Sequence, residues 1–152
     1  MTEVQLWSKL KPHLEGYGYA QKMETVKGIP DVLGICYGYP YLMELKVSPW
    51  PKRPTTMWRV KTTPQQRRHL SRYQRGGGLG LILVAIPNTG QWYLMTSNTP
   101  TEMEWEDVTR FRIAHGKLDK LGDVPVAILN YAALISGAPR DTPVLDTVIG
   151  GE

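Results

Sequence analysis

Cysteine and histidine are scarce in this sequence. Its 152 residues include one cysteine, Cys36, and three histidines. A disulfide within the chain is therefore excluded, and so is a structural zinc site built from the usual Cys and His ligands. A single free thiol favours a reducing compartment, so we expect a cytoplasmic protein.

Long hydrophobic runs are also missing. No apolar stretch approaches the roughly 20 residues that cross a bilayer, and the N-terminus lacks the basic-then-apolar layout of a secretory signal. The composition, 41% hydrophobic and 21% charged, is ordinary for a globular domain, and the length suits one hydrophobic core. We therefore expect no membrane as a partner.

Acidic residues are absent from a long central segment. Between Glu44 and Glu102 there is no Asp or Glu, although half of the 18 Lys and Arg residues fall there. A block of one charge favours a polyanion partner over a merely solubilising surface. The candidate phosphate contacts are Lys52, Arg53, Arg59 and Lys61 in a loop, and Arg68, Arg72 and Arg75 on one stripe of a helix.

Hydrophobic periodicity predicts a mixed central sheet flanked by helices, which is an α/β fold. The expected elements are a helix that begins after Thr2 and ends before Gly16, strands at 19–26, 32–37 and 41–47, a loop at 48–62, a helix from Pro64 to about Arg75, strands at 80–86 and 91–96, and a helix at 125–135. We expect residues 1–97 to form the core. Residues 98–152 should form an extension packed on it with a flexible tail, in which the apolar helix is either core or a homodimer interface.

Three polar residues carry the chemistry that the sequence offers. Glu44 and Lys46 lie two apart on an expected strand, so their side chains leave the same face, while Leu45 points to the other. Asp31, in the turn after Pro30, can supply a second carboxylate. Two carboxylates and the Leu45 carbonyl suit a hard cation such as Mg²⁺ or Mn²⁺. The Lys46 ammonium can then hold the attacking water and offset charge on a phosphate.

The segment Gly28-Ile-Pro-Asp31, separated by twelve residues from Glu44-Leu-Lys46, resembles the PD-(D/E)xK nuclease signature. The Thr63-Pro-Gln-Gln66 start of a basic helix, a glycine run and an apolar strand make the layout similar to the virus-type replication-repair nuclease (VRR-NUC) domain. Small members occur in phages and resemble Holliday junction resolvases. The resemblance covers residues 3 to 86 and implies a restriction-endonuclease-like fold.

The resemblance also implies roles for individual residues. Asp31, Glu44 and the Leu45 carbonyl would bind the metal, Lys46 would be catalytic, and Gln66 would point into the site from the second helix. An acidic residue of the first helix often completes such sites. Glu3 fits that place, and Glu15 and Glu24 remain competitors.

The sequence therefore predicts a Mg²⁺- or Mn²⁺-dependent DNA endonuclease. No sequence-reading element is recognisable in the basic block, so we expect cutting that is structure-selective, at branched, junction or flap DNA, or nonspecific. Three alternatives stay open: a DNA-binding protein without catalysis, a sequence-specific restriction enzyme and an RNA-directed nuclease. Paired cuts at a symmetric junction would require a homodimer. Trp50 and Trp58 could either stack on unpaired bases or pin the long loop to the body.

Overall fold

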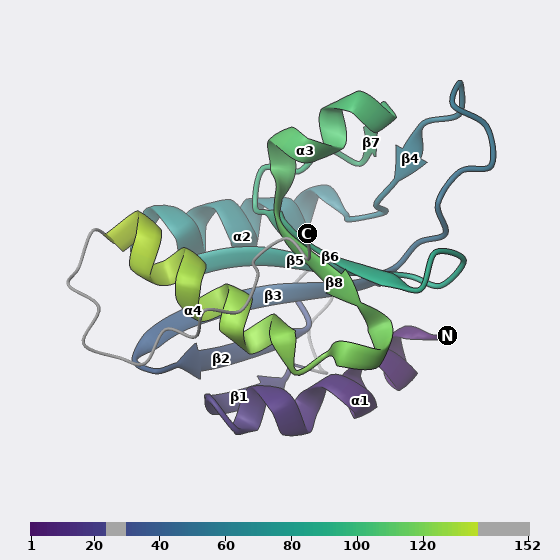
Figure 1. Ribbon diagram of the computed structural model, residues 1–152. Coiled ribbons are helices and arrows are strands. Elements are labelled where there is room, and N and C mark those ends of the chain that lie inside the picture. Colours follow the sequence, from purple (N-terminus) through teal and green to yellow (C-terminus); the bar gives the residue numbers. More distant parts are fainter. Residues whose placement is uncertain (24–29, 137–152) are drawn as a thin grey trace.

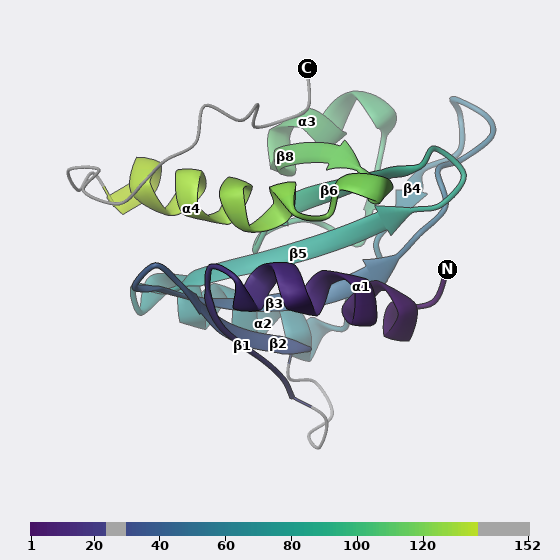
Figure 2. The same ribbon diagram turned by 60° about the horizontal axis from the view of Figure 1, so that its bottom comes forward.

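The computed structural model describes residues 1–23 and 30–136, and these form three layers with a sheet in the middle (Figures 1 and 2). Helices α1 (Glu3–Glu15) and α4 (Asp123–Ser136) cover one face of the sheet, and α2 (Pro64–Arg75) covers the other. The expected α/β architecture, a mixed sheet flanked by helices, is confirmed. The predicted flexible tail, from Gly137 onward, lies outside the described residues.

The main sheet has six strands in the order β1-β2-β3-β5-β6-β8. Its strands are β1 (Gly18–Lys22), β2 (Val32–Cys36), β3 (Tyr39–Val47), β5 (Leu79–Ile86), β6 (Gln91–Thr96) and β8 (Arg112–Lys117). The central pair β3 and β5 is parallel, with Glu44 opposite Ile82, and the other neighbours are antiparallel. All eight residues of β5 are buried, as its continuous apolar run predicts for a strand covered on both faces.

Both long helices of the first half begin where the sequence predicts. Thr2 caps α1 and Thr63 caps α2, each through a capping box in which the threonine hydroxyl accepts the N–H of the residue three positions on. Pro64 occupies the first turn of α2, where its missing N–H costs no hydrogen bond. Gly76 ends α2, so the glycine run acts as a stop between the helix and β5.

The two faces of the sheet bury separate apolar clusters. Leu6, Leu10 and Leu14 of α1 pack with the odd-numbered residues of β3 and with α4. Leu70 of α2 packs on the opposite face. Because neighbouring strand residues point to opposite faces, Leu45 lies in the first cluster, while Glu44 and Lys46 lie on the side covered by α2. This parity fixes which layer contains the candidate site.

The segment after residue 97 is more ordered than its weak periodicity suggests. It contains β7 (Glu102–Met103), η1 (Trp105–Asp107), α3 (Val108–Phe111), β8, η2 (Leu118–Lys120) and α4. Strand β7 pairs with β4 (Trp58–Arg59), which lies inside the stretch 48–62 that was expected to be entirely loop. Strand β8 forms one edge of the main sheet. Short strands of two residues, and a strand such as β8 with half-buried residues, leave little pattern in a sequence.

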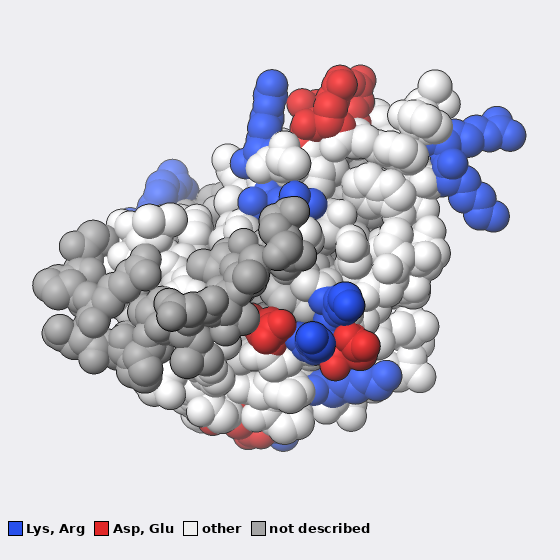
Figure 3. All heavy atoms as spheres, in the orientation of Figure 1, with Lys and Arg blue, Asp and Glu red and all other residues white. Residues whose placement is uncertain are grey.

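Helix α4 serves chiefly as core. Nine of its residues are buried, and Leu134 and Ile135 near its end are the exposed apolar ones. In the described parts of the chain, no helix is long and apolar enough to cross a membrane. The face drawn in Figure 3 carries acidic and basic side chains next to one another. The arginine-rich helix α2 lies behind the sheet in that orientation.

Candidate active site

Strand β3 places Glu44 and Lys46 side by side in the middle of the protein. The Lys46 ammonium lies 3.3 Å from Oε2 of Glu44, and the two side chains are 15% and 1% exposed. Among the described residues, Glu44 is the only buried side chain that carries a formal charge. A buried charge is costly unless it is paired or coordinated, so this position is unlike an ion pair on an exposed strand.

Asp31 reaches the same place from the residue before β2. The antiparallel pairing sets Val32 opposite Met43, so one further step brings Asp31 opposite Glu44. The Leu45 N–H donates to Oδ2 of Asp31 at 2.9 Å, which holds this carboxylate against β3. The structure thus brings together Asp31, Glu44 and Lys46 as the sequence predicts, although whether they are catalytic stays a prediction.

The surroundings of Glu44 are electrostatically unfavourable for its charged form. Burial is the main cause that raises the pKa of Glu44 to about 8, the neighbouring Asp31 carboxylate adds to it, and Lys46 opposes the shift. The second oxygen of Glu44, Oε1, is buried and has no hydrogen-bond partner. An acidic pair with an unsatisfied buried oxygen is the arrangement that a bound cation would compensate.

The residues present fit a divalent cation. Carboxylate oxygens of Asp31 and Glu44 and the carbonyl of Leu45 are hard ligands of the kind that Mg²⁺ and Mn²⁺ prefer. Within residues 1–23 and 30–136, however, no three or more His, Cys, Asp or Glu side chains gather as a metal cluster. A small cation such as Mg²⁺ keeps several waters when one or two carboxylates bind it, so two suffice.

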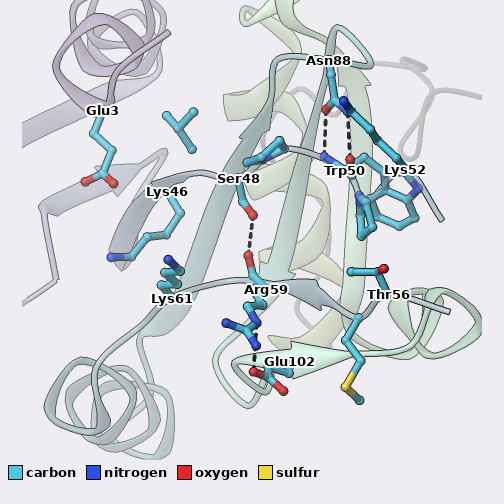
Figure 4. Close-up of a pocket in the computed structure, with 14 residues that line it drawn as sticks. Glu3, Lys46, Ser48, Trp50, Lys52, Thr56, Arg59, Lys61, Asn88 and Glu102 are labelled. Atoms are coloured by element: carbon cyan, nitrogen blue, oxygen red, sulfur yellow. Dashed lines mark hydrogen bonds and ion pairs between the residues drawn. The ribbon is translucent and has the colours of Figure 1, made fainter. Parts of the chain in front are cut away.

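A cavity of about 960 Å³ opens beside Lys46 (Figure 4). Glu3 lines it and points its carboxylate toward Lys46 from the start of α1. Glu15 is exposed at the other end of the same helix, about 18 Å along the axis at 1.5 Å per residue. Glu24 lies outside the described residues. Of the two candidate acids that the structure describes, Glu3 is therefore the one next to the site.

Gln66 has a structural task in addition to its predicted one. It is the third residue of α2, and its Oε1 accepts the N–H of Thr63 at 2.9 Å as part of the capping box. Its side-chain oxygen is thereby used at the helix start, and its amide nitrogen is the group left to face a substrate. Its direct role in catalysis stays a prediction.

The predicted phosphate contacts fall into two groups. Arg68, Arg72 and Arg75 line a groove of about 490 Å³ along α2, together with Ser97 and Asn98. Lys52, Arg59 and Lys61 line the large cavity. Arg53 is exposed in the loop between Lys52 and Arg59, and it lines neither the groove nor the large cavity. Arg59 differs from the rest, because its Nε lies 3.0 Å from a carboxylate oxygen of Glu102, which partly neutralises it.

Aromatic packing decides between the two roles considered for Trp58. Trp58 is fully buried, so stacking on a base is excluded for it. Its ring lies 5.2 Å from that of Trp50, which also contacts Trp105 at 5.4 Å and Tyr93 at 6.0 Å. Trp58 therefore pins the loop to the body, whereas Trp50 is half-buried, packs on the same aromatic rings and also lines the cavity. The role of Trp105 was not predicted from the sequence, because it depends on the pairing of β7 with β4.

Ser48 and Asn88 were also missed. The Ser48 hydroxyl donates to the Arg59 carbonyl, and the Asn88 side chain bonds both backbone groups of Trp50 (Figure 4). Both residues therefore fix the walls of the cavity. Neither carries a motif, since isolated Ser and Asn residues are common in turns.

Comparison with known proteins gives structural likenesses only. No protein-family model matches the chain, and no curated protein matches it in sequence. Among solved structures, Hjc of Archaeoglobus fulgidus, a Holliday junction resolvase, is similar with a TM-score of 0.47 and 13% identity, over 71% of this chain and 92% of the other. The bacterial homing endonuclease I-Ssp6803I is similar with a TM-score of 0.41 and 12% identity, over 66% and 69%. With both TM-scores below 0.5, the functional proposal rests on the geometry of Asp31, Glu44 and Lys46.

Proposed function

We propose that this chain is a metal-dependent DNA endonuclease of the PD-(D/E)xK type. The observation that carries the proposal is the buried Glu44 carboxylate, with Lys46 on one oxygen, nothing on the other and Asp31 alongside. A purely structural role explains this poorly, since an apolar residue at position 44 would avoid the cost of burying the charge.

Each residue has a distinct task in this proposal. Asp31 and Glu44 hold the cation, and the N–H of Leu45 keeps the Asp31 carboxylate oriented. When bound, Mg²⁺ or Mn²⁺ would supply positive charge to the phosphate and acidify a water. Lys46 contacts the buried Glu44 and also lines the open cavity. In this proposal it holds the attacking water and stabilises charge that develops on the phosphate.

Basic side chains provide the substrate surface in this proposal. The groove along α2 carries arginines without an acidic lining residue. The cavity beside Lys46 adds Lys52 and Lys61, although Glu3 and Glu102 line it as well. A DNA backbone that crosses both would bring a phosphodiester past Lys46. Contacts to the DNA backbone, and not contacts to base edges, would then position the substrate. This favours structure-selective or nonspecific cutting.

A cleavage panel tests the function. Labelled four-way junction, flap and linear duplex DNA are incubated with Mg²⁺, Mn²⁺ or EDTA, with an RNA duplex and plasmid DNA alongside. We expect metal-dependent cutting that is lost in Asp31→Asn and reduced about 10²–10³-fold in Lys46→Met, the usual cost of losing one stabilising donor. The exposed Asp119→Asn is the control and keeps full activity. Discrete plasmid fragments would instead indicate a sequence-specific enzyme.

One observation favours a second candidate, a DNA-binding protein without catalysis. In the described segments no third acidic or histidine side chain joins Asp31 and Glu44. The same panel separates the two functions, because binding without cutting under every metal condition identifies the non-catalytic protein.

A further inference from the structure

The large cavity has an apolar wall that phosphate binding does not explain. Trp50, Met57 and two prolines line it, and Met57 is 42% exposed. Four Lys and Arg residues and two glutamates, Glu3 and Glu102, also line the cavity, so its lining has a net positive charge. An apolar side chain that is open to water inside such a cavity suggests contact with an apolar part of a ligand.

Trp50 is held rigidly at this wall. Its backbone N–H donates to Oδ1 of Asn88 at 2.8 Å, and its carbonyl accepts from the Asn88 amide at 2.9 Å. Its ring packs on Trp58 and Trp105. Flanking prolines at 49 and 51 fix the loop further, because proline locks its own backbone dihedral φ. A ligand that meets this wall therefore loses little free energy to ordering it.

The opposite wall is cationic. Lys46 and Lys61 lie there together with Glu3, whereas Lys52 lies on the side of Trp50 and Asn88 (Figure 4). Arg59 lines the cavity too, but it is already paired with Glu102. The lysines give the cavity a net attraction for anions, and Lys46 connects it directly to Glu44.

A ligand that satisfies both walls is anionic at one end and has an apolar, aromatic face at the other. A nucleotide meets this description. In a duplex, neighbouring bases cover both faces of each base, so only an unpaired or extruded nucleotide can present its face to a side wall. A cavity of about 960 Å³ is within the range of pockets for ligands of this size.

We infer that this cavity binds an unpaired nucleotide of the DNA substrate, with the base against Trp50 and Met57 and its phosphates toward Lys46, Lys52 and Lys61. This inference rests on the proposed function and specifies its substrate class: DNA with an unpaired nucleotide next to the cut, as in flaps, gaps and bulges. The cavity, and not a sequence-reading element, then makes the nuclease structure-selective.

Binding in the absence of cutting tests the inference. Fluorescence anisotropy in EDTA compares a short labelled duplex with the same duplex carrying one unpaired thymidine. We expect the second to bind at least about five-fold more tightly, the lower end of what one stacked base contributes. Met57→Glu, an exposed position in the cavity, should abolish this preference, so that its loss of affinity is larger for the DNA with the unpaired thymidine than for the paired duplex. Trp50→Ala should abolish the preference as well.

The matched control is Leu134→Glu, which adds the same charge at a position 70% exposed at the end of α4. It keeps the preference and reports the general charge effect. Circular dichroism of each variant shows that it is folded. The inference is overturned if the wild-type protein binds both DNAs with equal affinity. It is also overturned if Met57→Glu lowers the affinity for both DNAs by the same factor. Cutting of paired duplex without any preference would defeat the inference alone, whereas preference without cutting in any metal would defeat the nuclease proposal alone.

Discussion

The backbone N–H of Leu45 donates to Oδ2 of Asp31 at 2.9 Å, which ties the residue before β2 to the middle of β3. This bond orients one carboxylate beside another, Glu44, that is almost fully buried. Two acids held together in this way repel one another in the absence of a cation. A cation bound between the two acids, as proposed, would therefore stabilise the fold independently of catalysis.

Metal binding should raise the melting temperature Tm. At a free concentration of Mn²⁺ or Mg²⁺ about 100 times Kd, linkage gives about 2.7 kcal/mol, which is several degrees for a chain of this size. Glu44→Gln should remove the rise, and above the Glu44 pKa of about 8 its metal-free Tm should equal or exceed that of the wild type, because a buried charge is lost there. Differential scanning fluorimetry measures both. Glu102→Gln, exposed and across the cavity, is the control, and an unchanged wild-type Tm with metal would count against the site.

The arginine stripe on α2 should set much of the salt dependence of DNA binding. Replacing Arg68, Arg72 and Arg75 with Ala should weaken binding and flatten the slope of log Kd against log salt by about one unit for each lost phosphate contact. Titrations at several salt concentrations measure the slope. The exposed pair Lys117 and Lys120, replaced by Ala, provides the comparison. An equal slope in wild type and triple variant would remove α2 from the interface.

The loop cations can be tested in the same way. Lys52, Arg53, Arg59 and Lys61 replaced together by Ala should also lower the slope. Arg59 should contribute least, since Glu102 already neutralises part of its charge. Restoring Arg59 alone to the quadruple variant should therefore change the slope by less than restoring Lys61 alone. The opposite order would show that the Arg59–Glu102 pair opens when DNA binds.

Gly80 permits close contact between α2 and β5. A Cβ there would lie 2.4 Å from the backbone oxygen of Leu70, so Gly80→Ala must displace the helix. We expect a loss of about 1–3 kcal/mol in the free energy of unfolding, the usual cost of overpacking, measured by urea denaturation. Gly16→Ala, whose Cβ would make ordinary contacts of 3.4 Å and 3.5 Å at φ −65°, should be neutral or slightly stabilising. Equal effects would contradict this packing.

Cys36 should be chemically inert in the native protein. It is 2% exposed, its Sγ donates to the Pro125 carbonyl, and burial raises the pKa of the thiol to about 12. The thiolate is the reactive form, and the fraction of Cys36 in this form would be very small at about pH 8. Iodoacetamide should therefore modify the thiol only in denaturant, as intact mass spectrometry would show. Rapid modification of the folded protein would place Cys36 at the surface.

The sequence alone determined the local elements and the set of chemical groups. Thr2 and Thr63 specify helix starts through hydrogen bonds within four residues, and the apolar run of β5 specifies a buried strand, because both depend on neighbours along the chain. The alternation along β3 likewise determined that Glu44 and Lys46 share a face. The spacing from Asp31 then suggested how the three groups could serve one reaction.

Only the tertiary structure decided which groups meet. It brought Glu3 to the cavity instead of Glu15, buried Trp58, paired Arg59 with Glu102 and used Asn88 to fix Trp50. It also added β8 to the sheet. These outcomes depend on contacts between residues far apart in sequence, such as the pairing of β4 with β7, and on which face each helix covers. The local periodicity of the sequence does not predict such contacts, because they contribute free energy only after the layers have packed.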